Sequence, residues 1–135
     1  NTRAAQLGVE AVFVDATGLS SETQLTALEI SKIAAELCKH SGFFKYSSIW
    51  MYTLVHNSGR ETTITNANIL VNDGSGVDGM STGSTGEAGY SMAATVKSGS
   101  ARFICVVLGD VNSKSRFAFA KETLLTAAAT RQRWR

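Results

Sequence analysis

The sequence contains no proline, although average usage near 5% predicts about seven in a chain of 135 residues. Its two cysteines, Cys38 and Cys105, lack metal-ligand spacing, so we expect two buried free thiols rather than a disulfide. His40 and His56 have no carboxylate or cysteine at ligand spacing, which argues against a metal centre. No apolar run approaches the roughly 20 residues of a membrane helix, and residues 1–8 contain no signal-peptide core. These absences leave the location of the protein unspecified.

The composition is that of an ordinary globular domain. It has 44% hydrophobic residues, 18% charged residues and a net charge of +2, which excludes a disordered or nucleic-acid-coating protein. The basic end, residues 131–135, is interpreted as a solvated helix terminus rather than a nucleic-acid or membrane patch, because a helix dipole favours cations there. A chain of this length buries roughly two thirds of its surface, which predicts a single domain spanning residues 1–135.

Three helices are predicted. Residues 1–7 read as the end of a helix that is closed by Gly8. Thr26 and Glu29 have the spacing of a capping box, which marks the start of a second helix. A long closing helix is expected over residues 113–133. The apolar faces that we assign to the core are Ile30, Ile33, Ala34 and Leu37 in the second helix, and Phe117, Ala120, Leu124 and Ala128 in the last.

The remaining patterns predict strands. Residues 48–56 and 60–66 are rich in aromatic, β-branched and threonine residues and flank Asn57-Ser58-Gly59, which is typical of a hairpin. Three further strands are predicted at residues 77–82, 90–97 and 101–108. The last of these is apolar without alternation, so we expect it to be covered on both faces. The fold class is therefore α+β, with a small, mostly antiparallel sheet and helices packed on both sides.

The glycine-rich segment matches two short motifs. Residues 74–79 fit G-x-G-x-x-G, but poor helix formers follow, so we reject dinucleotide binding. Residues 79–83 fit the G-x-S-x-G nucleophile elbow. That chemistry needs a histidine after the serine in the chain, and both histidines precede Ser81. A serine hydrolase with Ser81 as its nucleophile is therefore the weakest alternative.

The whole neighbourhood of this segment indicates a family. The informative stretches are residues 77–85, Ala88-Gly89-Tyr90, Ala93-Ala94-Thr95 and residues 104–109, with support from residues 1–8, Thr17-Gly18-Leu19, residues 26–29 and residues 65–68. In this order and spacing they resemble the C-terminal half of the catalytic domain of the serine D-alanyl-D-alanine carboxypeptidases, the low-molecular-mass penicillin-binding proteins. The resemblance covers most of the chain. It implies a partial β-lactamase/transpeptidase-like fold and makes residues 1–135 the C-terminal portion of such a domain.

The resemblance also implies roles for individual residues. In the family, a serine in Ser-x-x-Lys attacks the peptide bond between two D-alanines of the peptidoglycan stem peptide, and β-lactams acylate the same serine. Ser81 stands at the position of the lysine in the family's Lys-Thr-Gly strand, while Thr82 and Gly83 match that motif. Ser84 would offer a backbone N–H to the oxyanion hole. Arg116 corresponds to an arginine that helps to bind the terminal carboxylate of the stem peptide. The alternative interpretation is that Arg116 is an ordinary exposed arginine near the start of a helix. Neither a metal nor a cofactor is implied.

The same comparison indicates what is missing. The chain contains neither Ser-x-x-Lys nor Ser-x-Asn, so no catalytic set is complete and we predict that the chain alone is inactive. The resemblance implies an extracytoplasmic location and a stem peptide or β-lactam as ligand. In the family's fold, N-terminal strands pair beside the strand that corresponds to residues 101–108. We therefore expect an open edge there, and either a homo-oligomer or pairing with a complementary N-terminal segment.

Ala16 occupies a turn position where the family commonly has proline. Together with the complete lack of proline and the serine at position 81, it leads us to the hypothesis that the chain is a deliberately altered or degenerate fragment. The alternative function is then that of a non-enzymatic folded module that self-associates through the open edge.

Overall fold

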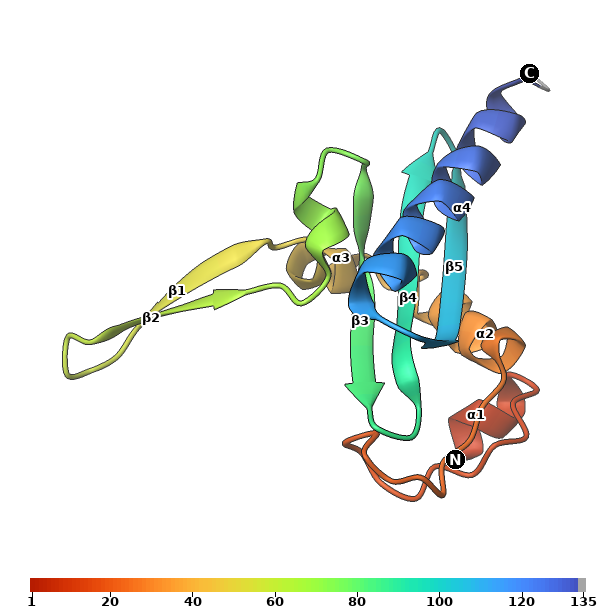
Figure 1. Ribbon diagram of the computed structural model, residues 1–135, viewed down its shortest axis with the longest axis horizontal. Helices are drawn as coiled ribbons and strands as arrows, with labels where there is room; N and C mark the ends of the chain where they lie inside the picture. Colours follow the sequence, from red (N-terminus) through yellow and green to blue (C-terminus); the bar gives the residue numbers. More distant parts are fainter. Residues whose placement is uncertain (134–135) are drawn as a thin grey trace.

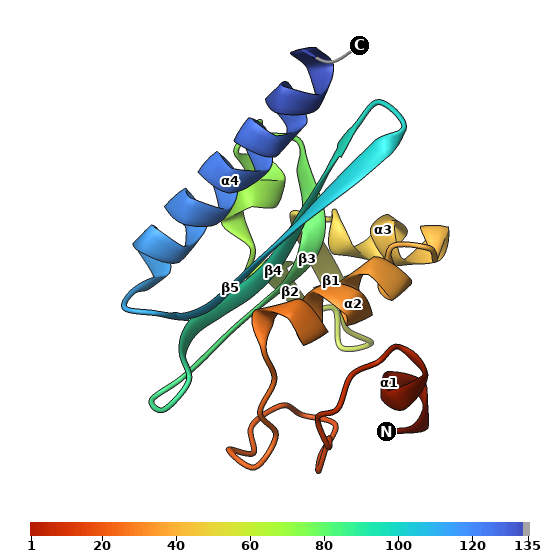
Figure 2. The same cartoon turned by 90° about the vertical axis from the view of Figure 1, so that its right-hand side faces the viewer.

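The computed structural model describes residues 1–133, and its centre is an antiparallel sheet with the strand order β3 (Val77–Thr85), β4 (Gly89–Ser98), β5 (Ala101–Asp110). Helix α4 (Ser113–Arg133) covers one face of the sheet, and α2 (Ala27–Leu37) crosses the other (Figures 1 and 2). The remaining elements are α1 (Thr2–Gln6), α3 (Ser41–Ser47), β1 (Met51–Val55), β2 (Glu61–Thr65) and the 3-10 helix η1 (Ile69–Asn72). The predicted α+β class, with antiparallel strands between helices, is confirmed.

The core lies between the sheet and α4. Alternate side chains of β4 point toward α4, as the period of a strand requires. The stripe predicted for the closing helix meets them, and its bounds at Ser113 and Arg133 agree with the prediction. The buried members from these two elements are Met92, Ala94, Val96, Phe117, Ala120 and Leu124, and Ala128 packs against them half-buried.

The predicted start of α2 is confirmed in detail. Thr26 Oγ1 accepts a hydrogen bond from the Glu29 N–H at 3.2 Å, and the Glu29 carboxylate accepts one from the Thr26 N–H at 2.9 Å. The Thr26 N–H, the Thr26 hydroxyl and the Glu10 N–H all donate to the Glu29 carboxylate, and these bonds lower its pKa to about 2. The prediction that the apolar face of α2 belongs to the core is wrong for most of its length. Only Ala34 is buried, and the other three residues of that face are half-buried.

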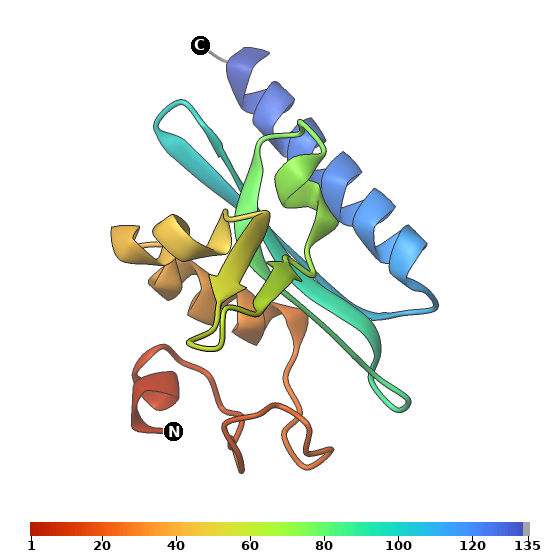
Figure 3. The ribbon, with the colours of Figure 1, turned by 90° about the vertical axis from the view of Figure 1, so that its left-hand side faces the viewer.

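The predicted hairpin forms, but it is a second, separate sheet. Strands β1 and β2 pair antiparallel around residues 57–59, with Tyr52 opposite Ile64. The hairpin projects away from the three-stranded sheet (Figure 1), and in Figure 3, which is viewed from that side, it lies in front of the sheet. Its two strands are almost entirely exposed. Helix α3 and the 3-10 helix η1, which flank the hairpin in the chain, were not predicted.

Strand β5 is the outermost strand on its side of the sheet. Its faces contact α4 and α2, so the prediction that it is covered on both faces is confirmed, although Leu108 stays 40% exposed. No strand within residues 1–133 pairs with its outer edge. The register with β4 shifts between Tyr90 and Met92, which places a bulge in β5 before Asp110. The regular part of the free edge therefore runs from Ala101 to Val107.

Both cysteines are free thiols, as predicted. Cys105 is buried, whereas Cys38 is only half-buried, which corrects the expectation of two buried thiols. Burial raises the pKa of each thiol above its usual value. No helix in residues 1–133 is long and apolar enough to cross a membrane. Of the basic end, Arg131 is exposed on α4, and residues 134–135 lie outside the described part of the chain.

Candidate functional site

Residues Ser81 to Ser84, which we call the wall segment, lie in the second half of β3. Ser81 pairs with Ala93 of β4, and Gly83 pairs with Ser91. Thr82 is half-buried and the other three residues are exposed. Because β3 is an end strand of the sheet, its outer edge pairs with no strand of the described chain. The structure thus brings the four predicted residues together along one open edge.

The start of β3 is fixed by side chains from the segments before it. Asn68, only 1% exposed, donates from Nδ2 to the Gly79 carbonyl at 3.1 Å and accepts from the Leu70 N–H at 3.2 Å. Ser47 at the end of α3 donates to the Asp78 carbonyl at 2.9 Å. A Cβ on Gly79 would lie 2.9 Å from Ser47 Oγ, so only glycine fits this approach without a shift. These contacts determine where the wall segment begins.

A second set of contacts holds Asp78, where the register of β3 with β4 shifts between Val77 and Gly79. Arg102 of β5 donates from Nη1 to Asp78 Oδ1 at 2.6 Å and to Thr95 Oγ1 at 2.9 Å. Its guanidinium lies 3.8 Å from the ring centroid of Phe44 in α3, a cation–π distance. Sequence reasoning missed Asp78, Arg102 and Asn68 as site residues. The sequence carries no signal for them, because the register shift at Asp78 appears only once β3 is paired with β4.

Arg116 reaches the wall segment from α4. Its side chain is buried, with 5% of the residue exposed, so the alternative of an exposed arginine is wrong. Nη1 donates to the Gly83 carbonyl at 3.1 Å and to the Ser91 carbonyl at 2.9 Å, and Nη2 donates to Ser113 Oγ at 3.2 Å. Burial lowers the pKa of Arg116 from its usual value, while Tyr90 and Asp110 act in the opposite direction. An arginine keeps its charge under such a shift, so a cation lies behind Gly83.

The contacts of Arg116 define the orientation of one peptide group. The carbonyl oxygens of Gly83 and Ser91 both accept a hydrogen bond from Arg116 Nη1, and the two residues are paired across β3 and β4. Both oxygens therefore lie between these two strands. In a trans peptide the C=O and N–H point in opposite directions, and the Ser84 N–H belongs to the same peptide group as the Gly83 carbonyl. The Ser84 N–H therefore points to the open edge of β3, away from β4.

The wall segment borders an open apolar pocket of about 510 Å³. The pocket lies between α2, α3 and the sheet. Ser81 and Met80 come from β3, and the half-buried apolar face of α2 forms the opposite side. The remaining lining residues include Phe43 and Tyr46 of α3. The incomplete burial of α2 thus leaves an apolar surface next to Ser81.

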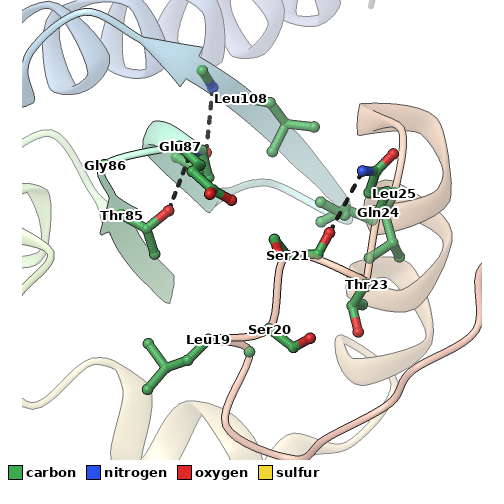
Figure 4. Close-up of a pocket in the computed structure, with 15 residues that line it drawn as sticks. Leu19, Ser20, Ser21, Thr23, Gln24, Leu25, Thr85, Gly86, Glu87 and Leu108 are labelled. Carbon is green, nitrogen blue, oxygen red and sulfur yellow. Dashed lines mark hydrogen bonds between the residues drawn. The ribbon is translucent and has the colours of Figure 1, made fainter.

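A larger open depression of about 730 Å³ lies at the other end of the sheet. Thr85 at the end of β3, with Gly86 and Glu87 of the following turn, faces the segment from Leu19 to Leu25 across it, and Leu108 lies on the side of β5 (Figure 4). It begins where the wall segment ends. None of the predicted site residues lines it.

The geometry around Ser81 differs from that of a nucleophile elbow. An elbow serine lies in a sharp turn from a strand to a helix, whereas Ser81 lies inside β3 opposite Ala93. His56 is on the hairpin, where its Nε2 is 2.9 Å from Thr62 Oγ1. His40 precedes α3 as its N-cap residue. The elbow interpretation gains no support from this arrangement.

Comparison with known proteins identifies the family of the chain. Residues 1–112 match the family model described as D-alanyl-D-alanine carboxypeptidase. The chain is 35% identical over 120 residues to the D-alanyl-D-alanine carboxypeptidase DacF of Bacillus subtilis, and the match covers 87% of this chain and 31% of DacF.

Solved structures show the same relationship. The Streptomyces K15 DD-transpeptidase superposes with a TM-score of 0.79 at 27% identity, covering 95% of this chain and 51% of that protein. Penicillin-binding protein D2 from Listeria monocytogenes, in its cefotaxime-bound form, gives a TM-score of 0.78 at 26% identity and covers 95% and 52%. The chain therefore spans about half the length of these structures and about a third of DacF. The family match over residues 1–112 and the shared fold identify the chain as a member of the D-alanyl-D-alanine carboxypeptidase family.

Proposed function

We propose that this chain supplies one wall of the ligand groove of a serine D-alanyl-D-alanine carboxypeptidase. The observation that supports this most directly is the open edge of β3, along which the Ser84 N–H points outward and Arg116 holds the adjoining carbonyl. An extended peptide adds to such an edge as a further strand. The proposed ligands are the peptidoglycan stem peptide and β-lactams. Ser81, Thr82, Gly83, Ser84 and Arg116 form the wall that receives them.

The wall alone is an incomplete site. No Ser-x-x-Lys and no Ser-x-Asn occurs in the sequence, and Ser81 stands where the family motif has its lysine. A serine there donates a hydrogen bond but offers no charge to a carboxylate. We therefore propose that the chain by itself does not catalyse acyl transfer, because a nucleophile and its base are both required. A complementary N-terminal segment would have to supply them, in an extracytoplasmic setting.

Labelling with a fluorescent penicillin tests this proposal. The chain alone is expected to show no covalent labelling. Adding the N-terminal half of DacF, which is proposed to bring the missing serine and lysine, is expected to produce labelling. Ser81→Lys is expected to strengthen that labelling by roughly tenfold or more, because it restores an electrostatic contact in the groove.

The control is the same mixture with the nucleophilic serine of the DacF half replaced by alanine, which should abolish the label. Labelling of the chain without any partner would contradict the proposal. Ester hydrolysis by the chain alone that disappears in Ser81→Ala would instead support the serine-hydrolase alternative. If neither the added segment nor Ser81→Lys produces a label, the groove is not functional.

A second candidate function is self-association, and the free edge of β5 favours it. The regular part of that edge, Ala101 to Val107, is rich in apolar residues and pairs with no strand within residues 1–133. Unpaired edges of this kind are templates for another chain. Sedimentation of the chain at rising concentration is expected to show a dimer or larger assembly. A monomer at high concentration, with this edge covered by its own chain, would exclude self-association and leave the groove proposal intact.

A further inference from the structure

The wall segment carries little information about its own pairing with β4. Residues 81–85 read Ser-Thr-Gly-Ser-Thr, so small polar side chains, or none, lie on both faces of this part of the strand. Register is strongly specified where one face of a strand is apolar and buried, but weakly where a strand is glycine-rich and polar on both faces. A slip by one residue would place Ser81 where Thr82 now lies, which changes the side chain there by one methyl group. Another part of the fold therefore has to select the register.

Strand β3 contains one extra residue before the wall segment. The register with β4 shifts at Asp78, which is therefore the extra residue of a β-bulge. If the register before the shift continued along the strand, Ser81 would lie opposite Met92, whereas in the structure it lies opposite Ala93. We call this alternative pairing the slipped register. The bulge thus decides the pairing of every residue in the wall segment.

We propose that Asn68 is a positioning residue that selects the register of the wall segment by holding Gly79 on the side of α3. Where it concerns a ligand, this inference rests on the proposed function. Successive residues of a strand alternate both in the face of the side chain and in the direction of the N–H and C=O groups. In the slipped register, Ser81 would therefore face α4, and the Ser84 N–H would point to β4 instead of the open edge. Asn68 thus controls which groups of the wall segment a ligand meets.

Two consecutive residues at the bulge face the same side of the sheet. In a regular strand, neighbouring Cβ atoms point to opposite faces. Here the Asp78 side chain accepts from Arg102, whose guanidinium lies 3.8 Å from the ring centroid of Phe44 in α3. A Cβ on Gly79 would lie 2.9 Å from Ser47 Oγ of the same helix. In the slipped register Asp78 would keep this face, whereas Gly79 would turn toward α4. The position of Gly79 therefore distinguishes the two registers.

Asn68 holds Gly79 in the position that distinguishes them. Its Nδ2 donates to the Gly79 carbonyl at 3.1 Å, and its Oδ1 accepts from the Leu70 N–H at 3.2 Å, so both ends of the amide are fixed. Its own N–H donates to Asn66 Oδ1 at 2.9 Å, which holds the backbone as well. Asn68 is 1% exposed, so turning Gly79 away would leave a buried donor without a partner. Such a group carries its full desolvation penalty, and this penalty opposes the slip.

The first test measures the register of the chain alone by NMR, through contacts between the Hα atoms of directly opposite residues. The native register links Thr82 to Met92, and the slipped register would link Ser81 to Met92. In Asn68→Ala, we expect the slipped contact in about half of the molecules or more. Gly79→Ala is the second variant. It keeps Asn68 but places a Cβ against α3, and it is expected to have the same effect.

Arg102→Met is the matched control, because it removes contacts of Asp78, the bulge residue that keeps its face in both registers. It is expected to show the native contact alone. The native contact alone in Asn68→Ala or in Gly79→Ala would overturn the proposal, as would the slipped contact in Arg102→Met. If Asn68→Ala does not fold, Gly79→Ala decides between these outcomes.

The second test uses the labelling assembly, with Ser81→Lys and the N-terminal half of DacF. Gly79→Ala is expected to lower the labelling rate per folded assembly in proportion to its loss of the native contact, by about twofold or more. Asn57→Ala, in the exposed hairpin turn, is expected to leave the rate unchanged. An unchanged rate in a slipped variant would overturn the role of the register in the groove. If the register slips as expected but no assembly can be labelled, the groove proposal fails while the selection by Asn68 stands.

Discussion

Replacing Asn68 by alanine is expected to lower the free energy of unfolding by about 2–4 kcal/mol, because two buried backbone groups lose their partners at once. The side chain donates to the Gly79 carbonyl and accepts from the Leu70 N–H, at a position that is 1% exposed. Water cannot replace these bonds without opening the contact between η1 and β3. Urea unfolding followed by circular dichroism measures the change, with an unchanged m-value expected.

Asn57→Ala provides the matched control, since Asn57 is exposed in the hairpin turn. Its effect is expected to stay within about 0.5 kcal/mol, as for most surface substitutions. Asn68→Asp tests the mechanism further, because it keeps the acceptor for Leu70 but removes the donor to Gly79. A loss with Asn68→Ala no larger than with Asn57→Ala would show that the start of β3 is held by other contacts, such as that of Ser47.

The strongest local patterns in the sequence were sufficient to predict the helices and the hairpin that contain them. The capping box at Thr26 and the stripe of α4 depend on residues three or four positions apart, and both appear in the structure as predicted. The hairpin was predicted for the same reason, since its turn and its strands are contiguous. Fold class follows from such local signals. The buried stripe of α4 follows from them too, whereas the surface that α2 buries does not.

The face of α2 shows where sequence reasoning stops. Its apolar spacing is that of a core helix, yet Ile33 and Leu37 border an open pocket beside Ser81. The spacing of apolar residues along a helix shows that one face is apolar. It does not show what covers that face, because the covering residues lie elsewhere in the chain or in another chain. The same holds for Arg116, whose burial depends on its position above the Gly83–Ser91 pair. That juxtaposition of α4 with two strands has no signature in the residues around position 116.

The second large effect is expected for Gly89→Ala, at the start of β4. Gly89 has a φ of +63°, a region that costs a residue with a Cβ about 1–2 kcal/mol. The new Cβ would also lie 2.9 Å from the Asp110 carbonyl oxygen and 3.2 Å from the backbone of Gly109, and backbone atoms cannot rotate out of the way. Strain and overlap together are expected to destabilise the chain by about 2–4 kcal/mol.

Gly86→Ala in the same turn separates these causes from a general effect of the β3–β4 connection. Gly86 does not have a positive φ, and a Cβ there would meet no atom within 4 Å. Its substitution is expected to change stability by less than about 0.5 kcal/mol. Because Gly89 lies two residues before Ser91, its strain would be passed to the strand pair that Arg116 holds. Amide hydrogen exchange at Gly83 and Ser91 should therefore become faster in Gly89→Ala but not in Gly86→Ala. Equal exchange rates in the two variants would show that the close packing of Gly89 against β5 does not shape the wall segment.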